Sequence, residues 1–288
     1  MNAQFPDEHS DDGKFERQED AFREWVTNDG SSPFPAARGR YHLYISLACP
    51  WANRTLIVRN WLGLQDAIGV TVVDPIRDER GWAFREGLGY EKDPLNGFLF
   101  LGKAYLATDP HFVGRVTVPV LWDKETRRIV NNSEDDICRM FSNAFTEFGH
   151  RNVDLFPQDL AAEHEQLAAL IYAKVNNGVY EAGFATSQAV YAAACRELFR
   201  VLDQLDARLS TRRYLFGPRI VEADWRLFCT LIRFDAVYHG HFKCNVRRIV
   251  DYPHLSGYLR DLYQQPGIAG HREFRSHQAP LLHDARGD

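Results

Sequence analysis

The sequence predicts two domains, an α/β domain followed by an all-α domain. Short β-type runs alternate with helical patterns up to about residue 150, and strand signals then vanish after the residues Phe156-Pro157-Gln158. Long helical patterns continue from there to about residue 265. A chain of 288 residues with 45% hydrophobic residues is long enough to bury two cores of ordinary size.

Residues 1–37 are expected to form an N-terminal extension, because they are rich in charge, Gly, Ser and Pro. The first 20 residues are polar and acidic and lack the basic and apolar regions of a secretory signal. No later run approaches the 18 apolar residues that a membrane-spanning helix needs. These features predict a cytoplasmic protein that does not enter the membrane.

The α/β domain is expected over residues 38–150. Residues 41–45 are a β-type run, and residues 50–62 have the apolar spacing of a helix that ends at Gly63. Further strands are expected at 68–73, 116–122 and 127–130, and a helix at 133–145. This order is thioredoxin-like. The segment 75–114 is far longer than a usual connection, which indicates a functional insert or a lid.

The second domain is expected over residues 151–288, with helical patterns at 159–177, 187–209, 222–238 and 254–265. The net charge of −5 is spread along the chain and gives no basic patch for nucleic acid or for an anionic membrane. The expected partner is therefore a small molecule.

The five cysteines are odd in number and irregularly spaced, which favours reduced thiols over a disulfide framework. No paired CxxC motif of a zinc site is present. His239, His241 and Cys244 could bind a metal by residue type, but no metal is predicted.

Cys49 is the candidate nucleophile. It follows a predicted strand and precedes Pro50, which suits the first position of a helix, so the thiol is expected at the helix N-cap. Backbone N–H groups and the helix dipole lower the pKa of such thiols from ~8.5 to between ~3.5 and 7.5. Ala52 stands where a dithiol oxidoreductase has its second cysteine, so an external thiol must resolve any mixed disulfide. The alternative is a buried structural cysteine.

Two further features accompany this cysteine. Val118-Pro119 opens the third predicted strand, where a cis proline of a thioredoxin-like protein turns the preceding backbone toward a bound thiol peptide. The alternative is an ordinary edge-strand proline. Residues 131–134 (NNSE) precede a helix, and small polar residues at a helix N-terminus provide an anion site, or simply a cap.

Long stretches of the chain resemble the Xi-class glutathione transferases, also called S-glutathionyl-hydroquinone reductases, from about residue 38 to residue 265. The stretches are SLACPWANRTLIVRNWLGL at 46–64, VDPIRDERGWAF at 73–84, GRVTVPVLWDKET at 114–126, NNGVYEAGFATSQ at 176–188 and EADWRLFCTLIRFDAVYHGHFKCN at 222–245. The resemblance implies a thioredoxin-like domain that binds glutathione, an all-helical glutathione-transferase domain that carries the second substrate, and a homodimer.

The resemblance also implies roles for individual residues. Cys49 is similar to the family's catalytic cysteine, and Tyr180 and Tyr238 are similar to the tyrosines that bind and protonate the quinol. The residues expected to contact the thiol are Trp82, Arg115, Val118, Pro119, Ser133 and Glu134. Trp82 could instead belong to the core of a lid, either tyrosine could be an ordinary buried phenol, and Arg115 could be a surface residue.

The sequence departs from the family pattern at two places. The family has Glu-Ser before the helix where this chain has Ser133-Glu134, which puts the usual binding of the γ-glutamyl group in question. Val221 replaces a Thr or Ser that caps the helix beginning near residue 222, so only the half of the capping box that Asp224 provides is expected.

The predicted reaction removes glutathione from a hydroquinone thioether through a mixed disulfide at Cys49, with a tyrosine hydroxyl supplying the ring proton. A conjugating glutathione transferase and a non-catalytic scaffold are the alternatives. The expected cosubstrate is glutathione. Mycothiol is the alternative thiol, because the reversed Ser133-Glu134 pair puts a carboxylate where the carboxylate of glutathione would lie. The bias toward arginine over lysine also fits a GC-rich actinobacterial source.

Overall fold

The computed structural model describes residues 15, 18–150 and 153–268. The first part of the predicted N-terminal extension, and residues 151–152 and 269–288 of the predicted helical domain, lie outside the described residues. The described chain divides into two compact units. One consists of residues 18–150 and 153, and the other of residue 15 and residues 154–268.

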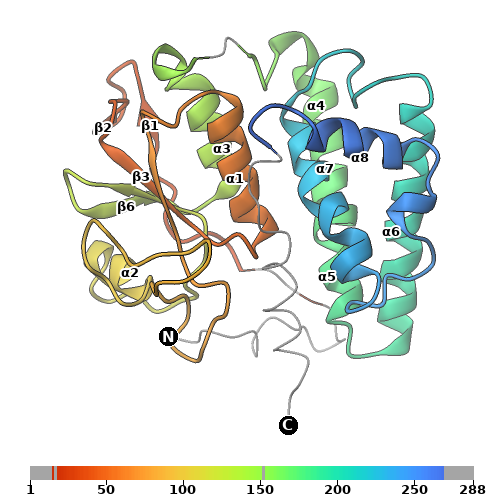
Figure 1. The fold of residues 1–288 in the computed structure, drawn as a ribbon, viewed down its shortest axis with the longest axis horizontal. Coiled ribbons are helices and arrows are strands. Elements are labelled where there is room, and N and C mark those ends of the chain that lie inside the picture. Colours follow the sequence, from red (N-terminus) through yellow and green to blue (C-terminus); the bar gives the residue numbers. More distant parts are fainter. Residues whose placement is uncertain (1–14, 16–17, 151–152, 269–288) are drawn as a thin grey trace. The chain divides into compact units, whose positions relative to one another are not determined.

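The first unit is built on a four-stranded sheet with the strand order β4-β3-β5-β6 (Figure 1). The strands are β3 (Tyr41–Ile45), β4 (Gly69–Val72), β5 (Val120–Asp123) and β6 (Arg128–Asn131). β3 pairs in parallel with β4 and antiparallel with β5, which pairs antiparallel with β6. The predicted thioredoxin-like arrangement is confirmed.

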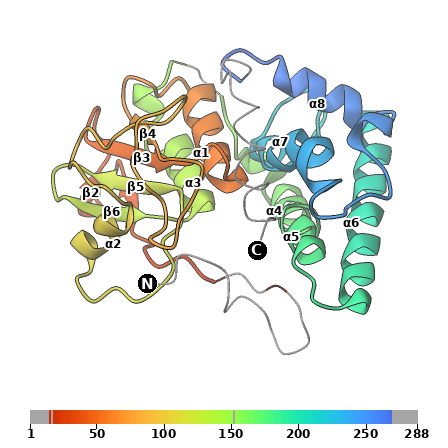
Figure 2. The same ribbon diagram turned by 60° about the horizontal axis from the view of Figure 1, so that its bottom comes forward.

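Three helices accompany the sheet. α1 (Pro50–Trp61) and α3 (Glu134–Asn143) pack against each other, whereas α2 (Gly102–Thr108) packs against β6, away from α1 and α3 (Figure 2). A short 3-10 helix, η1 (Thr146–Phe148), follows α3. The Nη2 atom of Arg54, on α1, lies 3.3 Å from Oε1 of Glu134, the first residue of α3. This buried guanidinium therefore links α1 to the first turn of α3.

Three strands begin later than predicted, and β4 does so by one residue, at Gly69. β5 begins at Val120 instead of residue 116 because Pro119 has no N–H to donate and the N–H of Thr117 donates to the Tyr105 hydroxyl, at 3.1 Å. β6 begins at Arg128 because Arg127 has φ of 54° and belongs to the turn.

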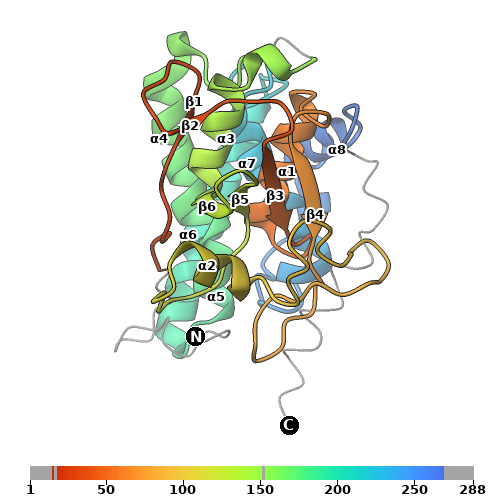
Figure 3. The same ribbon diagram turned by 90° about the vertical axis from the view of Figure 1, so that its left-hand side faces the viewer.

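Residues 18–37, called the N-terminal segment below, are attached to this unit. β1 (Val26–Thr27) and β2 (Phe34–Pro35) pair with each other, and neither strand was predicted. The N–H of Glu24 donates to the carbonyl of Val130 at 3.1 Å, and the N–H of Asn132 donates to the carbonyl of Phe22 at 3.1 Å. The segment therefore extends the hydrogen bonding of β6 and runs beside α3 (Figure 3).

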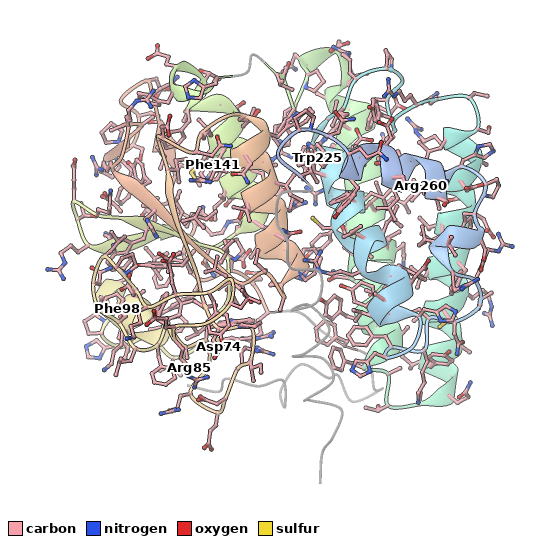
Figure 4. The ribbon with its side chains drawn as sticks, viewed as in Figure 1. Asp74, Arg85, Phe98, Phe141, Trp225 and Arg260 are labelled. Carbon is pink, nitrogen blue, oxygen red and sulfur yellow. The ribbon has the colours of Figure 1, made fainter. Side chains whose placement is uncertain are left out.

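The insert, residues 75–114, is held together by arginine side chains. Arg85 pairs with Asp74 at 2.8 Å and with Asp78 at 2.7 Å, and Figure 4 labels Asp74 and Arg85 side by side. The Arg80 guanidinium lies over the Phe100 ring, 4.4 Å from its centroid. Hydrogen bonding to Arg80 also lowers the pKa of Asp78 to about 2. The insert is thus a packed part of the unit and includes α2.

The second unit is helical, and the predicted all-helical half is confirmed. Its α-helices are α4 (Ala161–Ile171), α5 (Gly178–Gly183), α6 (Gln188–Leu209), α7 (Glu222–Arg233) and α8 (Leu255–Tyr263). Two short 3-10 helices, η2 (Gln158–Leu160) and η5 (Ile249–Asp251), precede α4 and α8. The predicted helix at 159–177 is α4 followed by a π-helical turn, η3 (Tyr172–Asn176). The predicted helix at 222–238 is α7 followed by a second π-helical turn, η4 (Phe234–Tyr238). Among the described residues, no helix is long and apolar enough to cross a bilayer.

Asp224 holds the start of α7. Its carboxylate accepts hydrogen bonds from the N–H of Val221 at 2.9 Å, the N–H of Leu215 at 3.0 Å and the Tyr258 hydroxyl at 2.9 Å. The half of the capping box expected from the sequence is therefore present. The N–H of Asp224 donates to the carbonyl of Val221 at 3.1 Å, and the Val221 side chain is buried.

We expect Asp224→Ala to lower the free energy of unfolding by about 2 to 5 kcal/mol, because two buried N–H groups lose their acceptor. Urea unfolding measures this change. The matched control is Asp203→Ala, an exposed acid, which should change the free energy by no more than about 0.5 kcal/mol. Equal effects of the two substitutions would contradict this role of Asp224.

The same residue predicts a pH dependence. Burial raises the pKa of Asp224 to about 6, above its unfolded value of about 4, so folding favours the neutral acid. The stability that the folded protein gains by holding this proton is fully present below about pH 4 and is lost as the pH rises through 6. The difference in stability between the wild type and Asp224→Ala should therefore shrink between pH 4 and pH 7.

Candidate active site

Cys49 occupies the N-cap of α1, as predicted. Its backbone is extended, with φ of −86° and ψ of 117°, and Pro50 is the first residue of the helix. The N–H of Asn53 donates to the carbonyl of Cys49 at 3.0 Å, which closes the first turn. The Cys49 side chain is partly exposed, whereas the other four cysteines are buried. The helix N-terminus favours the ionised thiol at this position.

The structure brings Cys49 and Val118 together. The Val118–Pro119 peptide bond is cis, as expected from the sequence. The Sγ atom of Cys49 lies 3.8 Å from the carbonyl oxygen of Val118, which is the distance of a weak S–H hydrogen bond. The start of α1 and the loop before β5 therefore meet at the thiol.

Hydrogen bonds join this loop to the start of α3. The Nδ2 atom of Asn132 donates to Oγ1 of Thr117 at 3.1 Å. The Tyr105 hydroxyl donates to the carbonyl of Thr117 at 3.0 Å. Ser133 directly follows Asn132, so it is the neighbour of the residue that hydrogen-bonds to the loop that contacts Cys49.

Ser133 is the N-cap of α3, and Glu134 is the first residue of the helix. The N–H of Ser133 donates to Oδ1 of Asn131 at 2.7 Å, and the Ser133 side chain makes no capping hydrogen bond. Asp20 of the N-terminal segment lies close to Ser133 and Glu134. Burial, followed by the nearby carboxylate of Glu134, raises the pKa of Asp20 to about 7.

Sequence reasoning missed Asp20. It lies more than 100 positions from Ser133 in a polar, acidic stretch, and its contact with α3 depends on the pairing of the N-terminal segment with β6. No local pattern in the sequence indicates that pairing.

Trp82 and Arg115, two further residues that were expected to contact the thiol, belong to the same unit. The Trp82 side chain is buried in the insert, where the Arg77 guanidinium lies over its ring, 4.9 Å from the centroid. The carbonyl of Trp82 accepts a hydrogen bond from the N–H of Leu101 at 2.9 Å. Arg115 is half-buried in the segment between α2 and β5. The side chain of Trp82 is therefore packed within the insert.

In the helical unit, Tyr180 and Tyr238 lie against each other. Their ring centroids are 6.0 Å apart, and the ring of Phe242 contacts both, at 5.4 Å and 5.2 Å. Phe15 stacks on Tyr180 with its centroid at 6.2 Å. Together with Phe184, these side chains form what we call the aromatic cluster. Tyr238 is buried and Tyr180 is half-buried.

The two π-helical turns position these tyrosines. η4 ends at Tyr238, and η3 ends just before the short helix that carries Tyr180. The Nδ2 atom of Asn176, in η3, donates to the carbonyl of Arg226 at 3.0 Å and to Oγ1 of Thr230 at 2.6 Å, so it ties η3 to α7. π-Helical turns occur frequently at functional sites.

Phe242 packs closely on Gly183. A Cβ atom at Gly183 would lie 2.4 Å from Cγ of Phe242, so only glycine admits the ring at this position. Sequence reasoning missed Phe15, Phe184 and Phe242, because phenylalanine in a helical pattern is equally typical of an ordinary core.

His239, His241 and Cys244 do not form a metal centre. Within the described ranges, no group of three His, Cys, Asp or Glu side chains is arranged to hold a metal ion. The Sγ atom of Cys244 lies 3.8 Å from the carbonyl of Phe242, and burial raises its pKa well above the usual range.

Two families match parts of this chain. Residues 48–144 match the glutathione S-transferase N-terminal domain, and residues 188–261 match the glutathione S-transferase C-terminal domain. The chain is 50% identical to the glutathionyl-hydroquinone reductase YqjG of Escherichia coli K12, over 91% of this chain and 82% of that protein. It is 44% identical to the glutathionyl-hydroquinone reductase PcpF of Sphingobium chlorophenolicum, over 91% and 83% of the two chains.

Solved structures are similar over the same length. The glutathione-bound structure of YqjG has a TM-score of 0.88 at 48% identity, covering 91% of this chain and 87% of that one. The Xi glutathione transferase of Phanerochaete chrysosporium has a TM-score of 0.91 at 44% identity, covering 95% and 89%.

Proposed function

Because this chain belongs to the Xi class of glutathione transferases, we propose that it is a thiol-dependent reductase that removes glutathione from hydroquinone thioethers. The observation that carries this proposal is the thiol of Cys49 at the N-terminus of α1, 3.8 Å from the carbonyl of Val118. This arrangement provides a nucleophilic sulfur beside a backbone that can pair with the cysteinyl part of a bound thiol.

In the first half-reaction, the Cys49 thiolate attacks the sulfur of the glutathionyl group. The bond between that sulfur and the ring carbon breaks, and its electrons enter the ring, which is held as the keto tautomer and leaves as an enolate. A tyrosine hydroxyl donates the proton that this ring carbon gains when the hydroquinone passes to the keto tautomer, and the departing enolate takes a proton on its oxygen. The products are the free hydroquinone and a mixed disulfide between Cys49 and glutathione.

Tyr180 and Tyr238 are the proposed proton donors. Their rings lie together in the aromatic cluster, which offers apolar faces on which a hydroquinone ring can stack. A phenol in this position stabilises the departing enolate first by hydrogen bonding and then by proton transfer.

In the second half-reaction, the thiolate of a second glutathione attacks the mixed disulfide. Glutathione disulfide leaves, and Cys49 returns to the thiolate. The glutathionyl sulfur of the substrate and the thiol of the second glutathione end as one disulfide, while the carbon–sulfur bond is reduced to a carbon–hydrogen bond, so electrons balance. Ala52 cannot resolve the intermediate, which makes the second glutathione necessary.

The thiol is proposed to bind along one wall of the α/β unit. The backbone of Val118, before Pro119, pairs with the cysteinyl group, and Ser133 and Glu134 face the γ-glutamyl end. Trp82 and Arg115 are proposed as further contacts, as the family resemblance implies.

The presence of Cys49 at this place argues against the two alternative functions, a conjugating transferase and a non-catalytic scaffold. A conjugating transferase stabilises the thiolate of glutathione with a hydroxyl, whereas a cysteine at that place forms disulfides with it. A non-catalytic scaffold does not require a partly exposed thiol at a helix N-terminus. Initial rates distinguish these functions: a reductase with a mixed disulfide gives parallel double-reciprocal lines when both substrates are varied, and intersecting lines would contradict the proposal.

Glutathione is the proposed cosubstrate, and mycothiol is the alternative. Cys49 is loaded with each thiol as a mixed disulfide, and the rate at which each free thiol resolves it is measured. We expect glutathione to react at least about tenfold faster, because buried polar groups left without their ligand reject an analogue strongly. Faster resolution by mycothiol would exclude glutathione as the natural thiol.

We also propose that the protein works as a homodimer in the cytoplasm, with the helical unit providing the second-substrate pocket and taking part in dimerisation. All five cysteines fall within the described residues and are thiols, which fits a reducing compartment. Light scattering of the purified protein should give twice the mass of the chain, and the mass of a single chain would contradict the dimer.

A further inference from the structure

We propose that Asp20, in the N-terminal segment, supplies the carboxylate that binds the ammonium group of the γ-glutamyl moiety at the start of α3. This inference rests on the proposed function, in which the thiol lies along this wall of the α/β unit. It assigns a binding role to a residue outside the predicted site, and it makes the N-terminal segment part of the thiol site.

The backbone fixes the place of Asp20. The two hydrogen bonds that join Phe22 with Asn132 and Glu24 with Val130 align the segment with the end of β6. The N–H of Phe22 also donates to Oδ1 of Asn132 at 2.8 Å. Asp20, two residues earlier, is thereby placed at the first turn of α3, close to Ser133 and Glu134.

Arg23 reinforces this attachment. Its Nη2 atom donates to Oδ1 of Asp136 at 2.8 Å, and its Nε atom donates to the other carboxylate oxygen. A bidentate pair of this kind fixes both position and orientation. The Nδ2 atom of Asn131 contacts the same Asp136 carboxylate, at 3.1 Å, so this acid is fully engaged.

Four carboxyl groups of the described residues lie at the start of α3, those of Asp20, Glu134, Asp135 and Asp136. Each acid of the first turn of α3 has an arginine partner: Arg54 for Glu134, Arg139 for Asp135 and Arg23 for Asp136. Asp20 differs from them, because the charged side chains recorded around it are Glu134 and Asp136, which raise its pKa, and Arg23, which is already paired with Asp136. Ser133, which lies close to Asp20, carries no charge, so the Asp20 carboxylate can pair with an ammonium group.

The titration of Asp20 fits this role. The groups that face it are Glu134 and Asp136 on α3, Tyr105 on α2 and Arg23 on its own segment. Burial and Glu134 raise the pKa of Asp20 to about 7, so the acid is protonated in most molecules below that pH. An ammonium group favours the ionised carboxylate, so its binding should release the proton to solvent.

The reversed order Ser133-Glu134 then has a physical consequence. Glu134 is held by the buried guanidinium of Arg54, at 3.3 Å, which withdraws it from pairing with a ligand. Ser133 lies close to Asp20 and carries no charge. The carboxylate that a γ-glutamyl ammonium requires thus comes from a different part of the chain.

The test uses the full chain with Cys49→Ser, so that binding is measured without turnover. Calorimetry compares glutathione with an analogue whose γ-glutamyl α-amino group is replaced by hydrogen. Adding Asp20→Asn should weaken the binding of glutathione about tenfold and that of the analogue less than twofold. The matched control is Glu19→Gln, the neighbouring exposed acid, which should leave both affinities unchanged.

The second readout is the number of protons that the protein releases when glutathione binds. At pH 6.5, in buffers of different ionisation enthalpy, glutathione should release a proton from the protein with Asp20 and none from the Asp20→Asn variant. Equal loss of affinity for both ligands, unchanged affinity for glutathione, or proton release that survives Asp20→Asn would each overturn the proposal. This experiment measures binding to a protein that lacks Cys49 and cannot turn over. Its outcome is therefore independent of whether the wild type catalyses the reductase reaction.

Discussion

Cys49→Ser should reduce the turnover of a glutathionyl-hydroquinone by at least about 10³-fold. The serine hydroxyl is not ionised at neutral pH, and it cannot form the mixed disulfide on which both half-reactions depend. Steady-state assays of hydroquinone release measure the loss. The affinity for glutathione, measured by calorimetry, should change little, because the backbone of Val118 and the start of α3 are untouched.

Cys195→Ala is the matched control. Cys195 is buried, and burial raises the pKa of its thiol, so it is expected to be unreactive. This variant should retain the activity of the wild type. Retention of more than a few per cent of activity by Cys49→Ser would mean that another group carries the reaction.

The second large effect is expected at the paired tyrosines. Tyr180→Phe and Tyr238→Phe should lower kcat by about 10²-fold or more for the residue that donates the proton, which is the usual scale of general acid catalysis. Each substitution keeps the ring, so the aromatic cluster and the binding of the hydroquinone should persist. The rate of Cys49 alkylation should stay the same in both variants.

Tyr191→Phe is the control for loss of a phenol hydroxyl. Tyr191 donates to the carbonyl of Lys243 at 2.6 Å and lies outside the aromatic cluster, so kcat should not fall. If both Tyr180→Phe and Tyr238→Phe turn over normally, the ring proton comes from water or from another group.

Local patterns in the sequence predicted the parts of the fold that depend on neighbouring residues. The N-cap at Cys49 follows from a strand, a cysteine and a proline in succession, and the structure has the helix starting at Pro50. The strand at 41–45 and the helix at 188–209 have the clear periods of their classes and were predicted to within a residue.

Features that depend on distant residues could not be predicted in this way. The start of β5 at Val120 reflects a hydrogen bond of Thr117 with Tyr105 on α2. The π-helical turns continue helical patterns, so their apolar spacing does not distinguish them from α-helix. The approach of Asp20 to Ser133 requires the N-terminal segment to pair with β6, and such pairing leaves no periodic signal in a polar stretch.

The most direct test of the proposed function is mass spectrometry of the protein after a single turnover. The wild type is mixed with one equivalent of a glutathionyl-hydroquinone, without free glutathione, and is then quenched in acid and digested. We predict that the peptide containing Cys49 gains the mass of one glutathionyl group as free hydroquinone appears, and that added glutathione removes it. Release of hydroquinone with no added mass on Cys49 would contradict the mechanism.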